Sequence, residues 1–242
     1  MRPTVFLFDI DGTLLLTGGA GRRAMRAAFG DLHGEHGPAA LDFAFAGMTD
    51  RAIVRTGLHA LGVSDADTAA IDGLLDAYLA RLADEVARTE KYEVMPGVLG
   101  TLEWLSALEG IAIGLGTGNV KKGAYVKLAR GSLDGSFAFG GFGCDAEDRT
   151  ELLRVGAARG AAALGLAAGG CRVVVIGDTP KDVAAAHGIG AECIGVGTGG
   201  FEPGTLLELG ADSAFATLEH DDVREALLGN HGPGKATPAS GA

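Results

Sequence analysis

Short apolar runs alternate with helical patterns along most of the chain, and this alternation restricts the possible fold more than any other feature. The runs lack strict alternation of polar and apolar residues, which is typical of strands buried on both faces of a parallel sheet. We expect strands at residues 5–8, 111–115, 137–139, 173–176, 192–196 and 213–215, and helices at 98–108, 120–130, 149–164, 180–187 and 204–209. The pattern predicts an α/β fold with a doubly wound parallel sheet, whose site lies beyond the carboxyl ends of its strands.

Residues 18–92 interrupt this alternation, because they show helical patterns and no convincing strand. We expect helices at 20–32, at 50–61 with Thr49 as N-cap, and one long helix or two over 65–90. An all-helical block after the first strand predicts an inserted cap domain with hinges at 16–19 and 90–97. The predicted domains are therefore a core of residues 1–17 and 93–228, a cap of residues 18–92, and a disordered tail of residues 229–242.

The formal net charge of −11 restricts the partners of the chain. Such an acidic surface repels polyphosphates, so we expect neither nucleic acid nor an anionic membrane as a partner. A small phosphorylated metabolite stays compatible, because a bound cation can reverse the local field. The three cysteines form no CxxC pair, which fits a reducing cytoplasm. The sequence leaves the oligomeric state open.

Two aspartates, Asp9 and Asp11, follow the first predicted strand in the segment FDIDGT. If the chain leaves the sheet at Asp9, both carboxylates can turn toward one cation, and Gly12 permits the tight backbone path this requires. Oxygen ligands of this kind suit Mg²⁺. Two acidic residues in a loop at a strand end are also common without any function, so this motif alone leaves both interpretations open.

Two further predicted strands end in polar residues. The strand at 111–115 leads into Gly116-Thr117-Gly118-Asn119 before a helix, where a hydroxyl and backbone N–H groups suit phosphate oxygens. Alternatively, Thr117 caps that helix. The strand at 173–176 leads into Asp178 and Asp182, four residues apart across a strand-to-helix turn. Asp178 suits the same metal; alternatively, it caps the helix and Asp182 is a solvated helix residue.

Together the three motifs resemble those of the haloacid dehalogenase-like hydrolase superfamily. Residues 9–13 are similar to its first motif, Thr117 to its second and residues 177–182 to its fourth, while residues 18–92 resemble its small helical cap. The resemblance implies that Asp9 is the nucleophile and Asp11 the acid/base. It also implies that Mg²⁺ is held by Asp9, Asp11 through its backbone carbonyl, and Asp178, with Asp182 supporting this arrangement, and that the phosphate is bound by Thr117, Gly118 and Asn119.

The family's third motif is a cation, usually lysine, near the start of the helix that precedes the fourth motif. This chain has no lysine between Lys127 and Lys181. Arg149 and Arg154 are the candidates for the catalytic and phosphate-binding cation. Arg149 is favoured because it opens the predicted helix, and an arginine can pair a carboxylate and a phosphoryl oxygen in one fork.

The resemblance also bears on the substrate. Dehalogenases of the superfamily lack a carboxylate at the place of Asp11, so its presence favours phosphoryl chemistry. Residues 45–51 resemble a turn in the caps of phosphoglycolate phosphatase-like members, in which Gly47 and Thr49 would face the leaving group; Thr49 fits a helix N-cap equally well. Arg22, Arg23 and Arg26 fit a solvated helix face better than a carboxylate site.

These features predict a Mg²⁺-dependent phosphatase that hydrolyses a small phosphomonoester through an aspartyl-phosphate. The alternatives are a phosphotransferase or sugar-phosphate mutase of the same superfamily, and a non-catalytic phospho-acceptor or binding module.

Overall fold

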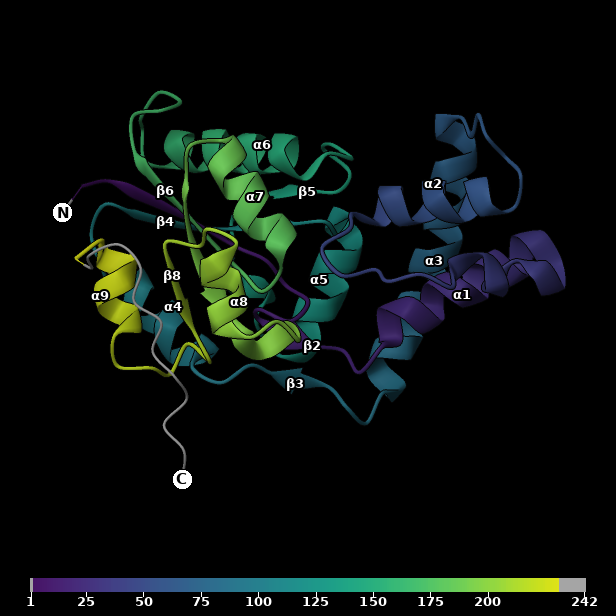
Figure 1. Ribbon diagram of the computed structural model, residues 1–242, viewed down its shortest axis with the longest axis horizontal. Coiled ribbons are helices and arrows are strands. Elements are labelled where there is room, and N and C mark those ends of the chain that lie inside the picture. The colour runs from purple at the N-terminus through teal and green to yellow at the C-terminus, as the bar shows by residue number, and fades with distance from the viewer. Residues whose placement is uncertain (1, 231–242) are drawn as a thin grey trace.

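A six-stranded parallel sheet forms the centre of the computed structural model, which describes residues 2–230 (Figure 1). The strand order is β5-β4-β1-β6-β7-β8. The strands are β1 (Thr4–Phe8), β4 (Ile111–Thr117), β5 (Gly140–Phe142), β6 (Arg172–Gly177), β7 (Glu192–Val196) and β8 (Ser213–Phe215). The predicted α/β fold with a doubly wound parallel sheet is confirmed.

Helices cover both faces of the sheet because successive residues of each strand point to opposite sides. On one face, Phe6 and Phe8 of β1 belong to an apolar cluster with residues of α4 (Val98–Ser106), α5 (Lys121–Arg130) and α9 (Val223–Leu228). On the other face, Val5 and Leu7 belong to a cluster with α6 (Arg149–Ala163), α7 (Pro180–Gly188) and α8 (Pro203–Glu208). The central strand is therefore buried on both sides.

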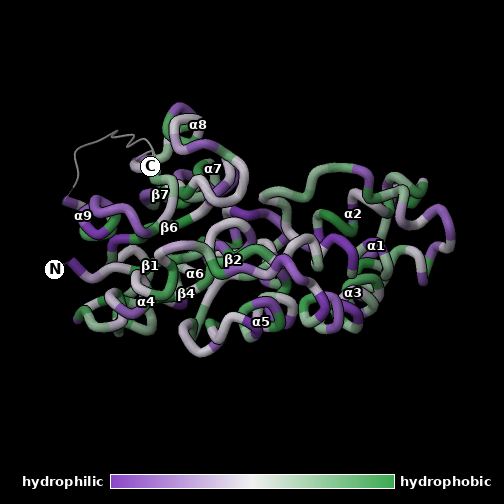
Figure 2. The backbone as a smooth tube through the Cα atoms, turned by 90° about the horizontal axis from the view of Figure 1, so that it is seen from below, coloured by the Kyte–Doolittle hydropathy of each residue, from purple (hydrophilic) through white to green (hydrophobic). Residues whose placement is uncertain are grey.

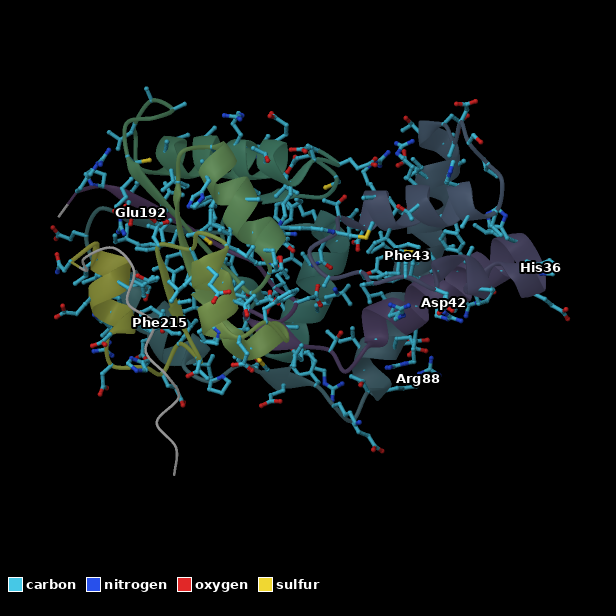
Figure 3. All side chains as sticks on the ribbon, viewed as in Figure 1. His36, Asp42, Phe43, Arg88, Glu192 and Phe215 are labelled. Carbon is cyan, nitrogen blue, oxygen red and sulfur yellow. The ribbon has the colours of Figure 1, made fainter. Side chains whose placement is uncertain are left out.

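A helical region lies beside this sheet, at the end of the molecule opposite α9 (Figures 1 and 2). It contains α1 (Ala20–His33), α2 (Asp50–Ala60) and α3 (Thr68–Arg88), with 3₁₀ turns at Gly34–His36 and Pro38–Leu41. Its own apolar cluster includes Met25, Phe29, Leu58, Tyr78 and Leu82. Figure 3 shows His36, Asp42 and Arg88 in this region, well separated from Glu192 and Phe215 in the sheet region.

A short antiparallel ribbon joins the two regions. It consists of β2 (Leu15–Leu16) and β3 (Glu93–Val94), with Leu15 opposite Val94. These strands overlap the two segments expected to be hinges, and the sequence did not predict them, because two residues carry no detectable periodicity. The ribbon therefore pairs the segment just before the helical region with the segment just after it.

One predicted strand was wrong. The run at 137–139 is not a strand; β5 lies three residues later, at Gly140–Phe142, and Asp134–Ser136 is a 3₁₀ turn. The reason is close packing: a Cβ atom at Gly141 would collide with the carbonyl oxygen of Leu152 on α6, so only glycine fits at this position of the strand. Phe137 is buried outside the strand, where its ring packs against the ring of Phe8.

The remaining differences are at the ends of elements. The pattern over 65–90 forms one helix, α3, whose N-cap Asp67 accepts a hydrogen bond from the backbone N–H of Ala70. Helix α9 and the 3₁₀ turn Gly197–Gly199 were not predicted. The predicted disordered tail lies outside the described residues, apart from its first two. No helix within residues 2–230 combines the length and apolarity needed to cross a membrane.

Candidate active site

Three loops meet at the carboxyl edge of the sheet, because β1 lies between β4 and β6. Asp9 directly follows β1, and its backbone N–H donates a hydrogen bond to the carbonyl of Ile176 at the end of β6 (2.9 Å). Asp178 follows β6, and Gly118 follows β4. All three residues line one cavity of about 730 Å³, which the helical region also lines. The motifs predicted at separate strand ends therefore share a single site.

The first motif turns back onto Asp178. Gly12 adopts φ +91°, and a Cβ atom there would lie 2.5 Å from Oδ2 of Asp178, so glycine is required for both reasons. The hydroxyl of Thr13 donates a hydrogen bond to Oδ1 of Asp178 (3.0 Å). A Cβ atom at Gly199 would also collide with Asp178. The Asp178 carboxylate is thus held from two sides.

Arg149 is the cation that contacts Asp9. Its Nη2 lies 3.0 Å from Oδ2 of Asp9, and its Nε donates a hydrogen bond to Oδ1 of Asp182 (2.9 Å). The side chain is buried, as are those of both partners. Arg154, the other candidate, is exposed and pairs with Glu151. The structure therefore brings Arg149, and not Arg154, into contact with Asp9.

Asp182 holds Arg149 in place from the first turn of α7. Its Oδ2 accepts hydrogen bonds from the hydroxyl (2.7 Å) and backbone N–H (3.0 Å) of Thr179, which is the N-cap of the helix. The alternative in which Asp178 caps this helix is wrong, because Thr179 does so. The alternative in which Asp182 is solvated is also wrong, since Asp182 is fully buried.

The carboxylates of Asp9, Asp178 and Asp182 carry more negative charge than Arg149 balances. One oxygen of each lies within 4.8 Å of the others. Burial raises the pKa of Asp9 to about 6, with Arg149 opposing and the neighbouring carboxylates adding to the rise. Burial and the charges of Asp182 and Asp9 raise the pKa of Asp178 to about 8. A hard divalent cation is the charge that this oxygen cluster lacks, so the residues fit Mg²⁺.

Asp11 lies on the cavity side of the loop, with its side chain 42% exposed. Its Oδ2 accepts hydrogen bonds from Nδ2 of Asn119 (2.8 Å) and from Nζ of Lys127 (2.6 Å). Nδ2 of Asn119 also donates to the hydroxyl of Thr117 (2.9 Å). Asn119 therefore connects the first motif to the second.

Thr117 is fully buried at the end of β4 and is not among the residues that line the cavity. It does not cap the following helix, because Val120 is the N-cap of α5. Gly118 and Asn119 do line the cavity. The side chain of Asn119 is already engaged by Asp11 and Thr117, so its predicted contact with phosphate stays a prediction, as does that of Thr117.

Lys127 and Asp50 are the site residues that the sequence interpretation missed. Lys127 is buried, 5% exposed, and Asp50, at the start of α2, is 7% exposed. Burial opposes the charge of Lys127, yet Asp11 and Asp50 together raise its pKa above the ordinary value. A signal for Lys127 did exist: it lies one turn after Gly123 and Ala124, on the buried face of α5.

Residues 47–50 dock the helical region on the strand ends. Gly47 has φ +64°, and a Cβ atom there would lie 2.7 Å from the hydroxyl of Thr179. The backbone N–H of Asp50 donates to the carbonyl of Gly118 (2.8 Å). Thr49 is the N-cap of α2, and its hydroxyl donates to the carbonyl of Glu147 (3.0 Å). Gly47 lines the cavity and Thr49 does not.

The arginines of α1 differ from one another. Arg23 pairs with Glu85 and Arg26 with Asp42, as expected for a solvated face. Arg22 lines the cavity instead, where it stacks on Phe45 and donates to the backbone carbonyls of Leu41 and Phe43. Within residues 2–230, no carboxylate lies within 4.0 Å of Arg22, so its charge is not neutralised by a side chain.

Two family models match this chain. A family model described as haloacid dehalogenase-like hydrolase matches residues 3–190, and a second, HAD-hydrolase-like model matches residues 156–226. No curated protein matches the sequence significantly.

Several solved structures share the fold. A hydrolase from Pseudomonas syringae is 21% identical, with a TM-score of 0.64 over 95% of this chain and 100% of the other. A predicted phosphoglycolate phosphatase from Haemophilus somnus is 16% identical, with a TM-score of 0.64 over 93% and 98%. A candidate beta-phosphoglucomutase from Thermotoga maritima is 22% identical, with a TM-score of 0.58 over 95% and 99%. At these identities the likeness shows the fold.

Proposed function

Because this chain belongs to the haloacid dehalogenase-like hydrolase family, we propose that it is a Mg²⁺-dependent phosphatase of small phosphomonoesters in which Asp9 is the nucleophile. One observation carries the proposal: the buried Asp9 contacts Arg149 and lies in the same carboxylate cluster as Asp178, while Asp11, two residues on, faces the cavity. The proposed nucleophile, phosphate-binding cation and acid/base thus lie within one site.

The chemistry takes two steps. An oxygen of Asp9 attacks phosphorus, the bond from phosphorus to the leaving oxygen breaks, and Asp11 gives that oxygen a proton. Asp11 then takes a proton from the water that attacks the aspartyl-phosphate, which regenerates Asp9 and releases phosphate. Arg149 offsets the negative charge of the phosphoryl oxygens. Mg²⁺, when held by Asp9 and Asp178, supplies further charge neutralisation and orients the phosphoryl group.

The lining of the cavity supports a small anionic leaving group. Arg22 offers a charge that, within residues 2–230, is stacked on Phe45 and hydrogen-bonded to backbone carbonyls without a carboxylate partner, which suits a carboxylate such as that of glycolate. Met25, Phe45, Met48 and Ile53 supply an apolar wall. Gly47 lies where the helical region meets Thr179 and is the predicted cap contact to the leaving group.

A second candidate is a phosphotransferase or sugar-phosphate mutase. The cavity of about 730 Å³ favours it, since this volume is within the range of pockets that hold much larger ligands than glycolate. Such an enzyme would share Asp9 and Asp11 and pass the phosphoryl group to a second hydroxyl.

Phosphate release from a panel of phosphomonoesters, including phosphoglycolate and sugar phosphates, tests both candidates. The panel is run with and without Mg²⁺ on wild type, on Asp9→Asn and on the surface control Asp76→Asn. Release that requires Mg²⁺, persists in the control and disappears in Asp9→Asn supports the phosphatase. An isomerised sugar phosphate without net release supports the mutase, and equal release by wild type and Asp9→Asn refutes the role of Asp9.

A further inference from the structure

Lys127 is a buried cation that none of the family motifs accounts for. It lies on α5, and its side chain is 6% exposed. Its Nζ contacts Oδ2 of Asp11 at 2.6 Å. A Cβ atom at Gly21 of α1 would lie 3.4 Å from this Nζ, so α1 passes directly over the ammonium group. A lysine is enclosed in this way only when its charge is compensated.

The two donors to Asp11 reach the same oxygen. Lys127 and Asn119 both donate to Oδ2, and within residues 2–230 no hydrogen bond is made to Oδ1. Oδ2 therefore has little capacity left to carry a proton, because a proton there would face two N–H donors. Oδ1 is therefore the oxygen that is left to exchange a proton with a ligand, since Asp11 lines the cavity.

Asp50 of the helical region is fixed next to the start of the helix that carries Lys127. Asp50 accepts a hydrogen bond at Oδ2 from the backbone N–H of Val120 (2.8 Å), immediately before α5, and its own N–H donates to Gly118. These bonds fix the start of α2 against the start of the helix that carries Lys127. The geometry of Asp11 is thus supported by residues from both regions.

We propose that Lys127 is a positioning residue: with Asn119 it occupies Oδ2 of Asp11 and reserves Oδ1 for the proton that passes to the leaving oxygen and then returns from water. This inference rests on the proposed phosphatase chemistry. In the first step the Oδ1–H bond breaks as the leaving oxygen gains the proton. In the second step water gives a proton back to Oδ1 as its oxygen bonds to phosphorus and the bond from phosphorus to the Asp9 oxygen breaks.

The first test compares leaving groups. kcat/KM reports the steps up to departure of the leaving group, and a leaving group of low pKa needs little help from an acid. Lys127→Met should lower kcat/KM about 100-fold for an alkyl phosphomonoester and less than about 5-fold for 4-nitrophenyl phosphate. Lys122→Met, on the exposed face of the same helix, should match wild type for both.

Equal losses for the two substrates, or a raised KM with unchanged kcat, would overturn the inference, because they would mean that Lys127 acts on substrate binding and not through Asp11. Circular dichroism and urea unfolding of Lys127→Met establish that the variant is folded before its kinetics are compared.

The second test is a double-mutant cycle with 4-nitrophenyl phosphate. If Lys127 acts through Asp11, then Lys127→Met in the Asp11→Asn background should cost less than about 2-fold in kcat, although it lowers kcat when Asp11 is present. The double variant removes the charges of Lys127 and Asp11 together, so neither is left buried without its partner. The test therefore remains usable if Lys127→Met alone unfolds. Additive losses refute the inference. If Asp9→Asn is inactive but the losses in this cycle are additive, only the proposed role of Lys127 is refuted. The proposed phosphatase function is then unaffected.

Discussion

Asp50→Asn should make the protein more stable at pH 8. The carboxylate is buried, and its Oδ2 accepts a hydrogen bond from the backbone N–H of Val120, a bond that an asparagine oxygen can also accept. Burial raises the pKa of Asp50 from 3.8 to about 6, although Lys127 opposes the rise. At pH 8 the folded protein therefore contains an ionised carboxylate at a buried position, where ionisation costs more free energy than it does in the unfolded chain.

The sign and size of the effect follow from this pKa. The folded state binds the proton of Asp50 more tightly than the unfolded state, so the free energy of unfolding falls as pH rises from 3.8 to about 6, and stays lowered above that. A shift of about two units corresponds to about 3 kcal/mol. Asparagine has no such titration. The gain from Asp50→Asn should be close to zero near pH 4 and up to about 3 kcal/mol at pH 8.

Urea unfolding of wild type and Asp50→Asn at several pH values between 4 and 8 measures this difference, and titrations common to both proteins cancel. Asp76→Asn, an exposed position on α3, is the control and should stay within about 0.5 kcal/mol at every pH. A variant less stable than wild type at pH 8, or a difference that does not change with pH, would refute the reasoning.

Four further outcomes are expected. Gly12→Ala should lower the free energy of unfolding by at least about 1–2 kcal/mol in urea, because φ is +91° there. Arg149→Met leaves buried carboxylates without a partner and should cost about 3–5 kcal/mol by the same measurement. Mg²⁺ at 100 times its Kd should stabilise wild type by about 2.7 kcal/mol in thermal unfolding and should not stabilise Asp178→Asn. Glu147→Gln removes an exposed ion pair with Arg55 and should change stability by less than about 1 kcal/mol.

Much of the site could be predicted because its chemistry is concentrated at strand ends. Parallel strands place their carboxyl ends on one edge, so Asp9, Gly118 and Asp178 had to meet once the strands were recognised. The choice of Arg149 over Arg154 also followed from position, since Arg149 is the first residue of α6 and contacts Asp9 at the end of β1. Here local pattern and topology together were sufficient.

The position of β5 could not be predicted in this way. Phe137 and Phe139 carry the apolar signal, yet the strand forms from Gly140 onward because α6 packs so closely that Gly141 has no room for a side chain. Strand position was decided by contact with a helix that begins several residues later, which no local pattern records.

The sequence by itself determined the α/β fold, the helical insertion and the aspartates of the site, because periodicity and strand-end motifs are local properties. Only the tertiary structure decided which residues surround Asp11. Lys127 comes from α5 of the sheet region and contacts Asp11. Asp50 comes from α2 of the helical region and is hydrogen-bonded next to the start of α5, because residues 47–50 dock on Gly118 and Thr179. A buried charge is stabilised by partners that are distant in sequence, so its role becomes visible only when those partners are in place.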